Sequence, residues 1–330
     1  MTRAAERACE RIAMAPTTGT DVFDEMVRTT FDVIAEVTFS GDGQMDSQAI
    51  HTAIDHYIDS VAKVSVLDIM GVPTWVPRPG RLFTGRMLSD MRALADTSIE
   101  HRRQLGPKPV PDLLDLLVQG EDPETKRKMT TAELRDNLLT FIVAGHETTA
   151  LTLGWALYLC AFDPAIQAKA RAEAQAVLKG AAATPADVPN LPLCRMIIDE
   201  ALRLYPPAAF LSRTAMQADT LCGRDIRKGD TVMMPIYALH RNELLWDTPD
   251  AFNPYRFQDP KAIDRYAYLP FGNGPRVCIG AQFALQEAVI ILSTLLSRFQ
   301  FSPVAGRDPK PEMVLTLRPK GGVWLHAKPA

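Results

Sequence analysis

Apolar residues recur at three- and four-residue steps along most of this chain, which is the spacing of amphipathic helices. The stretch 20–40 shows this pattern clearly, and Asp21 stands where it can cap that helix. The longest helix is predicted over residues 130–160, with Thr130 or Thr131 as its cap. The same spacing predicts further helices over residues 1–15, 47–62, 81–105, 111–119, 164–179, 191–205 and 279–297.

Short β segments interrupt the helical pattern in the C-terminal half of the chain. Residues 208–236 contain brief apolar runs between turn residues, which indicate strands. The segment VLTLRPKGGVWLHA predicts a β-hairpin that turns at Gly321 and Gly322. Residues 71–80, rich in proline and glycine, and residues 237–277 predict loops. We therefore expect a mainly α fold with small β-sheets in a single domain.

Composition and charge exclude several classes of protein. The net charge of −3 gives no electrostatic reason to expect a nucleic-acid partner. The longest apolar runs are shorter than the roughly 20 residues that span a bilayer, and the N-terminus carries charges where a signal peptide is apolar. The five cysteines include no CxxC pair, which argues against a disulfide framework and a zinc ribbon. We expect a soluble, cytoplasmic protein without a membrane anchor.

Cys278 stands in a different setting from the other four cysteines. Two glycines and a proline precede it in the segment FGNGPRVCIG, and a long apolar helix follows. The positive end of a helix and its unpaired N–H groups stabilise a thiolate over a thiol. Such a thiolate can act as a nucleophile or bind a metal as one axial ligand, if a macrocycle supplies the other ligands. A buried cysteine at the start of a helix is the alternative interpretation.

The segment FGNGPRVCIG fits the pattern Phe-x-x-Gly-x-Arg-x-Cys-x-Gly, and it resembles the haem-binding loop of the cytochrome P450 family. The resemblance implies that the cofactor is haem b and that Cys278 is the axial ligand of its iron. It also implies that Arg276 pairs with a haem propionate. By the same resemblance, further residues of the loop contact the cofactor: Phe271, Gly272 and Gly280.

Two more segments are similar to motifs of this family, in the family's order. The segment EALR resembles the Glu-x-x-Arg of the K helix, and FNPYRF resembles Phe-x-Pro-Glu-Arg-Phe with Tyr255 in place of the commoner glutamate. The resemblance implies that Glu200, Arg203 and Arg256 form an ion-pair network that braces the cysteine loop and has no catalytic role. On the sequence alone, a Glu and an Arg three residues apart form a surface pair worth ~0.2–0.5 kcal/mol.

The segment AGHETT lies midway along the longest predicted helix, although a glycine and two threonines have low helix propensity. It resembles the Ala-Gly-x-Asp/Glu-Thr-Thr of the family's I helix, which is distorted over the haem. The resemblance implies that Thr148 hydrogen-bonds dioxygen and that Glu147 relays protons. Ala144 and Gly145 would then face the cofactor.

Two residues outside these motifs are also expected near the cofactor. Arg213 lies where the family has a basic residue that pairs with a haem propionate, and its planar fork suits a carboxylate. A solvated strand arginine is the alternative. His240 falls where members of the family place a polar residue near the other propionate. Residues 208–211 would line the pocket above the haem.

The resemblance covers nearly all 330 residues, but it begins at what looks like the family's D helix. None of the four tryptophans belongs to the Trp-x-x-x-Arg motif of the C helix. We therefore expect a single, partial P450 domain over residues 1–330, a truncated form without the family's N-terminal helices and first sheet.

The resemblance implies a haem-thiolate monooxygenase that inserts one oxygen atom of O2 into a small or medium lipophilic substrate. Electrons are expected from a separate partner, either a ferredoxin with its reductase or a flavoprotein. One alternative is a catalytically impaired remnant that binds haem poorly or serves as a scaffold. Another is a peroxide-using haem-thiolate enzyme, which the intact pair Glu147 and Thr148 disfavours.

Overall fold

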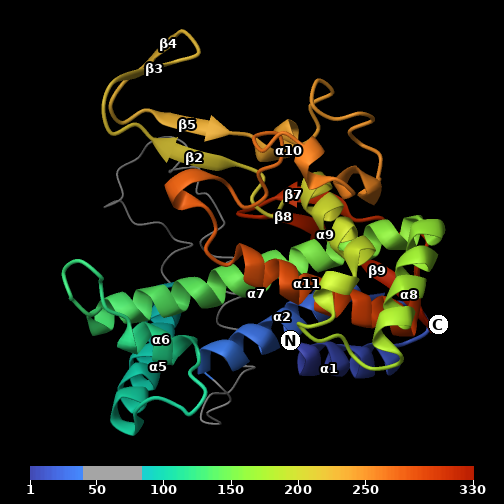
Figure 1. Cartoon of the computed structure of the whole chain (residues 1–330), viewed down its shortest axis with the longest axis horizontal. Coiled ribbons are helices and arrows are strands. Elements are labelled where there is room, and N and C mark those ends of the chain that lie inside the picture. The colour runs from blue at the N-terminus through green and yellow to red at the C-terminus, as the bar shows by residue number, and fades with distance from the viewer. Residues whose placement is uncertain (40–83) are drawn as a thin grey trace. The chain divides into compact units, whose positions relative to one another are not determined.

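The computed structural model describes residues 1–39 and 84–330. This part of the chain separates into two compact units, a larger one of residues 1–26 with 148–330 and a smaller one of residues 27–147 (Figure 1). The division falls inside two helices, α2 (Val22–Phe39) and α7 (Thr131–Phe162). The expectation of a single domain stays a prediction. The helix predicted over 47–62 and the loop over 71–80 lie outside the described residues.

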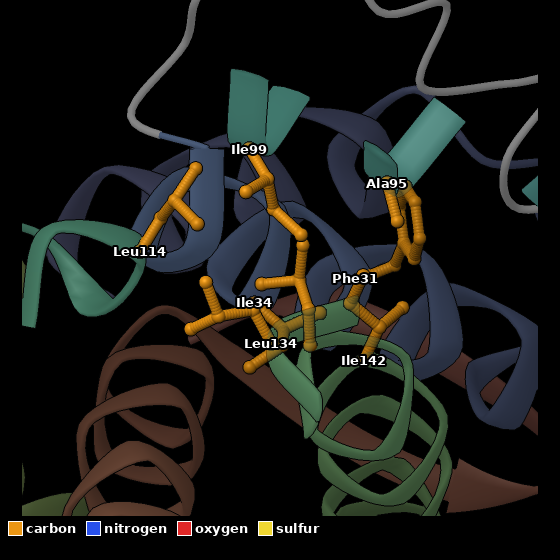
Figure 2. Close-up of a cluster of buried hydrophobic side chains, with 8 residues drawn as sticks. Phe31, Ile34, Ala95, Ile99, Leu114, Leu134 and Ile142 are labelled. Carbon is orange, nitrogen blue, oxygen red and sulfur yellow. The ribbon is translucent and has the colours of Figure 1, made fainter. Parts of the chain in front are cut away.

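The smaller unit is built from helices that share one apolar core. It holds most of α2, the first half of α7, α5 (Thr84–Leu105) and α6 (Leu113–Gln119). Side chains three, four or eight positions apart meet in this core, as the amphipathic pattern predicts (Figure 2). They are Phe31, Ile34, Ala95, Ile99, Leu114, Leu134, Leu138 and Ile142.

Two helices of this unit begin at reciprocal side-chain caps. Asp112 accepts from the N–H of Asp115 at 2.9 Å, and Asp115 accepts from the N–H of Asp112 at 3.0 Å, which fixes the start of α6. At α7, Glu133 accepts from the N–H of Thr130 at 2.8 Å, while Thr130 accepts from the N–H of Glu133 at 3.3 Å. Each arrangement satisfies backbone donors that a helix N-terminus otherwise leaves unpaired.

The larger unit is organised around the long C-terminal helix α11 (Ala281–Arg298). Helices α1 (Thr2–Ala13), α8 (Pro164–Leu178) and α9 (Pro192–Leu204) pack against it (Figure 1). Its residues 287–296 are all buried, which explains why the segment is apolar on every face. The short helix α10 (Ile236–Leu239) and several 3₁₀ turns occupy the region that the sequence predicted to be irregular.

The strands of the larger unit pair antiparallel in small sheets. One sheet has the order β1-β9-β6, and the remaining strands pair as β2-β5, β3-β4 and β7-β8. The β3-β4 hairpin extends beyond the β2-β5 ribbon in Figure 1. The strands are β1 (Thr20–Asp21), β2 (Leu211–Thr214), β3 (Asp219–Leu221), β4 (Arg224–Ile226), β5 (Thr231–Met234), β6 (Phe299–Pro303), β7 (Lys310–Met313), β8 (Leu317–Lys320) and β9 (Trp324–Pro329).

The predicted hairpin at Gly321 and Gly322 is wrong. Strand β8 pairs with β7, and β9 pairs with β6 and β1, so the two glycines separate strands of different sheets. Both glycines have the positive φ of a hairpin turn, +83° and +79°. The carboxylate of Asp21, however, lies against Gly322 and accepts from the N–H of Val323 at 2.9 Å, which directs β9 to β1.

The expected fold class, mainly helical with small sheets, is confirmed. The start of α2 also agrees, because Asp21 accepts from the N–H of Phe23 at 3.0 Å and caps the helix. Across the described ranges, no single helix combines the length and apolar character needed to cross a membrane. Only α7 and α8 taken together, across a bend of 115°, meet those criteria.

Candidate functional site

Cys278 lies in a loop that is closed by its own backbone. The N–H of Cys278 donates to the carbonyl of Phe271 at 2.9 Å, and the N–H of Val277 donates to the carbonyl of Gly274 at 3.0 Å. Gly272 and Gly274 have φ of +70° and +76°, which side-chain-bearing residues rarely adopt. The loop therefore holds Cys278 in place just before α11, with Gly280 as the helix cap.

The loop presents the Cys278 thiol at the surface among apolar groups. Cys278 is exposed, and its neighbours Val277 and Ile279 are 53% and 85% exposed. A Cβ added at Gly272 would lie 3.5 Å from Leu211 Cδ1, so the base of the loop rests against β2. An exposed sulfur flanked by apolar side chains suits a flat, apolar ligand whose metal it can bind.

The other cysteines have different environments. Burial raises the pKa of Cys9 to about 11 and that of Cys160 to about 12, and it raises the pKa of Cys194 well above its ordinary value. These three therefore stay as inert thiols. Cys222 is exposed, in the turn between β3 and β4.

The described residues fit a metal ion that is already held in a macrocycle and needs one ligand from the protein. Within the described ranges, no three His, Cys, Asp or Glu side chains gather into a metal site. A single exposed thiolate is the donor set of a haem whose ring supplies the other four equatorial ligands. On that chemistry, Cys278 fits the cofactor predicted from the sequence.

The structure brings Glu200, Arg203 and Arg256 together. Arg203 Nε lies 2.7 Å from Glu200 Oε2, and neither side chain is exposed to solvent. Arg256 Nε lies 3.4 Å from Glu200 Oε1, and that oxygen also accepts from the N–H of Asn253 at 2.9 Å. Glu200 on α9 thus contacts both the N-cap residue Asn253 and Arg256 of the 3₁₀ turn Pro254–Phe257, the turn that also contains Tyr255.

His240 is fully buried and uses both ring nitrogens. Its Nε2 accepts from the N–H of Leu269 at 2.9 Å, so Nδ1 carries the proton and donates to the carbonyl of Arg203 at 3.2 Å. Burial lowers the pKa of His240 to about 4, which keeps the ring neutral. Both ring nitrogens thus contact backbone groups, and the expected place of His240 near a haem propionate stays a prediction. His240 links the end of α9 to the irregular segment just before Phe271.

The two predicted propionate partners lie on the surface. Arg213 is exposed on β2, with Nη1 donating to the carbonyl of Ser212 at 2.8 Å. Arg276 is exposed in the 3₁₀ turn Gly274–Arg276 of the cysteine loop. Both belong to the larger unit, as Cys278 does. Their pairing with a propionate stays a prediction.

Helix α7 continues without a break through the segment AGHETT. The expected distortion is therefore not an interruption of the helix. Instead, carbonyl groups within this segment and just before it accept additional side-chain donors. His146 Nδ1–H donates to the carbonyl of Ile142 at 2.8 Å, and the Thr30 hydroxyl donates to the carbonyl of His146 at 2.7 Å. The Thr152 hydroxyl donates to the carbonyl of Thr148 at 2.9 Å.

The predicted residues of this segment are divided between the two units. In the smaller unit, Ala144 is exposed and Glu147 is buried. A Cβ at Gly145 would approach Ile34 Cδ1 to 3.1 Å, so the packing of α2 already requires a glycine there. Thr148 begins the second stretch of the larger unit and is half-buried.

Sequence reasoning missed Glu287. This residue lies on α11 with 1% of its surface exposed, and its Oε1 has no hydrogen-bond partner among the described residues. Burial raises the pKa of Glu287 to about 8. The sequence did contain a signal for it, a glutamate inside the apolar run ALQEAVIIL. Burying a carboxyl group costs free energy of desolvation, so a glutamate in such a run is unusual.

Comparison with known proteins gives a consistent result. A family model described as Cytochrome P450 matches residues 1–328. Cyclooctatin synthase of Streptomyces melanosporofaciens is 34% identical over 95% of this chain and 70% of the relative. The bifunctional cytochrome P450/NADPH–P450 reductase 2 of Bacillus subtilis is 35% identical over 91% of this chain but only 29% of the relative. Cyclooctat-9-en-7-ol 5-monooxygenase of the same Streptomyces is 36% identical over 72% of this chain and 52% of the relative.

Proposed function

The chain belongs to the cytochrome P450 family of haem-dependent oxidoreductases, and from that premise we propose that it is a haem-thiolate monooxygenase. In this proposal it inserts one atom of O2 into a small or medium lipophilic substrate. The observation that carries the proposal is the closed loop that presents the Cys278 thiol at the surface, directly before the buried helix α11. Haem b, the cofactor of this family, supplies the binding and activation of O2 when it is bound.

We assign the chain's own residues to three tasks. Cys278 binds the haem iron through its thiolate, within a loop that includes Phe271, Gly272 and Gly280. Arg276 and Arg213 offer planar, bidentate donors to the haem propionates.

On α7, Ala144 and Gly145 face the cofactor in this proposal. Thr148 hydrogen-bonds dioxygen and Glu147 relays protons to it, because a hydroxyl and a carboxylate in series can pass protons to a reacting group. Thr148 is half-buried and Glu147 is buried, the setting in which a relay is shielded from bulk water.

The buried network supports the loop. Arg203 Nη1 donates to the carbonyl of His240 at 2.8 Å, and the His240 ring holds the N–H of Leu269, two residues before the loop begins. Glu200, Arg203 and His240 therefore act as a brace in this proposal and take no part in chemistry. Arg256 extends the brace to the 3₁₀ turn Pro254–Phe257.

The names of the relatives support the choice of partners. The name of the Bacillus relative joins a P450 to an NADPH–P450 reductase, which supports a flavoprotein as electron donor, and a ferredoxin with its reductase is the other option. One Streptomyces relative is named for a cyclic alcohol, which supports a lipophilic substrate. We place the protein in the cytoplasm, consistent with five free cysteines.

The carbon monoxide difference spectrum of the reduced, haem-loaded protein tests the proposed ligand. We expect a thiolate-type band from the unsubstituted chain and from Cys222→Ala, the matched control because Cys222 is the other exposed cysteine. Cys278→Ala should lose the band. A thiolate-type band in Cys278→Ala, or its absence from the unsubstituted chain, would overturn the proposal, and the latter would favour a non-catalytic remnant.

A further inference from the structure

The segment that leads into the cysteine loop is attached to helix α9 at two consecutive residues. The hydroxyl of Tyr268 donates to the carbonyl of Asp199 at 2.9 Å and to its carboxylate Oδ1 at 3.2 Å. The next residue, Leu269, donates its N–H to the ring of His240, and that ring also contacts the carbonyl of Arg203. Asp199 and Arg203 lie four residues apart on α9, so the two attachments are separated by about one helical turn, ~6 Å.

Asp199 offers a separate carboxylate oxygen to each of two partners. Its Oδ2 lies 2.8 Å from Arg195 Nε, which leaves Oδ1 for Tyr268. The Asp199 side chain is 13% exposed, whereas that of Arg195 is 41% exposed. Burial raises the pKa of Tyr268 well above its ordinary value, and the neighbouring Asp199 carboxylate acts in the same direction. The phenol therefore stays protonated and remains a hydrogen-bond donor at neutral pH.

The ring of Tyr268 is held by packing in which its hydroxyl takes no part. Its centroid lies 4.8 Å from that of the Phe257 ring and 5.4 Å from that of the His240 ring. The ring also packs against the buried cluster that includes Trp246 and Phe257. A phenylalanine at this position would keep these contacts and lose only the two hydrogen bonds to Asp199. The hydroxyl therefore supplies an attachment to α9 that packing of the ring does not.

Backbone hydrogen bonds continue from these attachments to the cysteine. The carbonyl of Leu269 accepts from the N–H of Gly272 at 3.1 Å, and the carbonyl of Phe271 accepts from the N–H of Cys278 at 2.9 Å. Gly272 turns the chain between these two bonds, with φ of +70°. A displacement of Tyr268 would therefore be passed to Cys278 through a loop that its own backbone closes. All of these residues lie in the larger unit.

We propose that Tyr268 and Asp199 are positioning residues for the thiolate of Cys278. A segment attached at one point can rotate about it, whereas a segment attached at two points has a fixed direction. His240 supplies one of the two points, and the hydrogen bonds between Tyr268 and Asp199 supply the other. The loop then presents the sulfur in one place. The role of the thiolate in this inference rests on the proposed monooxygenase function.

Three variants separate this attachment from packing and from general stability. Tyr268→Phe removes the hydroxyl and keeps the ring, while Asp199→Asn keeps an acceptor oxygen for that hydroxyl. Thr294→Val is the matched control, because the Thr294 hydroxyl accepts from the N–H of Ala183 at 3.0 Å, a buried hydrogen bond elsewhere in the larger unit.

The haem-loaded proteins are reduced under carbon monoxide in urea below the unfolding transition, and the rate at which the thiolate-type band is lost is measured. We expect this rate to rise several-fold in Tyr268→Phe, and to stay near the unsubstituted rate in Asp199→Asn and Thr294→Val. A rate in Tyr268→Phe no higher than that in Thr294→Val would overturn the positioning role. A raised rate in Asp199→Asn would remove Asp199 from the proposed pair.

Hydrogen–deuterium exchange tests the attachment without reference to the haem. The N–H groups of Gly272 and Cys278 are hydrogen-bonded within the loop, so their exchange rates report how often the loop opens. We expect exchange over residues 269–278 to quicken several-fold in Tyr268→Phe, while α11 exchanges at the unsubstituted rate. Equal exchange of the loop in Tyr268→Phe and the unsubstituted protein would show that the hydroxyl does not hold this segment.

The outcomes for this inference and for the proposed function are distinguishable. If the unsubstituted protein lacks a thiolate-type spectrum, the proposed function fails, whatever the exchange of the loop. If that spectrum is present and Tyr268→Phe loses its band no faster than Thr294→Val, the positioning role is refuted while the monooxygenase stands. Faster exchange of the loop without faster loss of the band leads to the same conclusion, because the attachment then does not position the thiolate.

Discussion

Arg203 and Glu200 form an ion pair in which neither side chain is exposed, and Arg203 leaves no donor unused. Its Nε and one Nη2–H donate to the Glu200 carboxylate at 2.7 and 2.8 Å. Its other three N–H groups donate to the carbonyls of His240, Pro249 and Ala251 at 2.6–3.2 Å. Five donors with five acceptors in fixed directions require the planar fork of arginine.

The first prediction concerns this pair. Arg203→Ala should lower the free energy of unfolding by ~3–5 kcal/mol, because it leaves the Glu200 charge buried without its main partner. Arg203→Lys should lose part of that amount, since an ammonium group has only three donors. Arg195→Ala on the same helix is the control, because Arg195 is 41% exposed, whereas Arg203 is fully buried. Its loss should be smaller, since its partner Asp199 keeps the Tyr268 hydroxyl as a donor at 3.2 Å. Urea unfolding measures all three, and equal losses in Arg203→Ala and Arg195→Ala would contradict the brace.

The second prediction concerns the buried imidazole. The folded pKa of His240, about 4, lies below the ordinary value of 6.5, so its contribution to stability is present above pH 6.5 and is lost as the pH falls to about 4. The free energy of unfolding should fall by roughly 3 kcal/mol over this window.

The pH window of His240 overlaps that of Glu287, whose effect has the opposite slope, so only a difference between proteins isolates it. We expect the difference between the unsubstituted protein and His240→Asn to narrow as the pH falls from 6.5 to 4. A difference that is independent of pH over this range would show that His240 is not held neutral in the fold.

The third prediction concerns the residue assigned to oxygen activation. Thr148→Ala should fold and bind haem, since Thr148 is only half-buried and alanine has a higher helix propensity than threonine. It should lower the rate of product formation by at least ~10²-fold, which is the smallest effect expected when a positioned proton-transfer group is lost. The electrons that no longer yield product should appear as hydrogen peroxide. Thr152→Ala is the control for the local backbone, because it removes only the donor to the Thr148 carbonyl. An unchanged yield of product per electron in Thr148→Ala would remove this residue from the proposed relay.

The fourth prediction compares two adjacent glycines. Gly321 and Gly322 both have positive φ, so an alanine at either position is strained by about 1 kcal/mol. A Cβ at Gly322 would also overlap the Asp21 carboxylate, whereas a Cβ at Gly321 meets nothing within 4 Å. Gly322→Ala should therefore lower the thermal midpoint much more than Gly321→Ala. Similar midpoints for the two variants would show that Asp21 can move aside without loss.

The sequence predicted what depends on neighbouring residues. The spacing of apolar residues located the long helices, because each helix buries one face of a local pattern, as Leu134, Leu138 and Ile142 do on α7. The motif around Cys278 was equally readable, since its turns are set by nearby glycines. The pair Glu200 and Arg203 lies within one helical turn, and the structure brings it together as the resemblance implied.

The features that the sequence did not reveal depend on distant backbone. The two partners of the His240 ring are main-chain groups of residues 203 and 269, which no side-chain pattern encodes. Strand β9 pairs with β1, which lies about 300 residues earlier in the sequence. This long-range strand pairing overrides the local preference of the two glycines for a hairpin turn. Glu287 was overlooked because the burial that raises its pKa arises only after folding, when other helices pack around α11.

The hydrogen bond between Asp21 and Val323 has a consequence for how the chain folds while it is synthesised on the ribosome. Asp21 can cap α2 as soon as Phe23 and Asp24 have been made, but the N–H of Val323 is 302 residues away. Strand β1 must therefore wait for β9 until nearly the whole described chain has been synthesised. Closing so long a loop is slow and entropically unfavourable. Helices α1 and α2 will thus form well before the sheet to which β1 belongs, at the stage when chaperones bind exposed apolar surface.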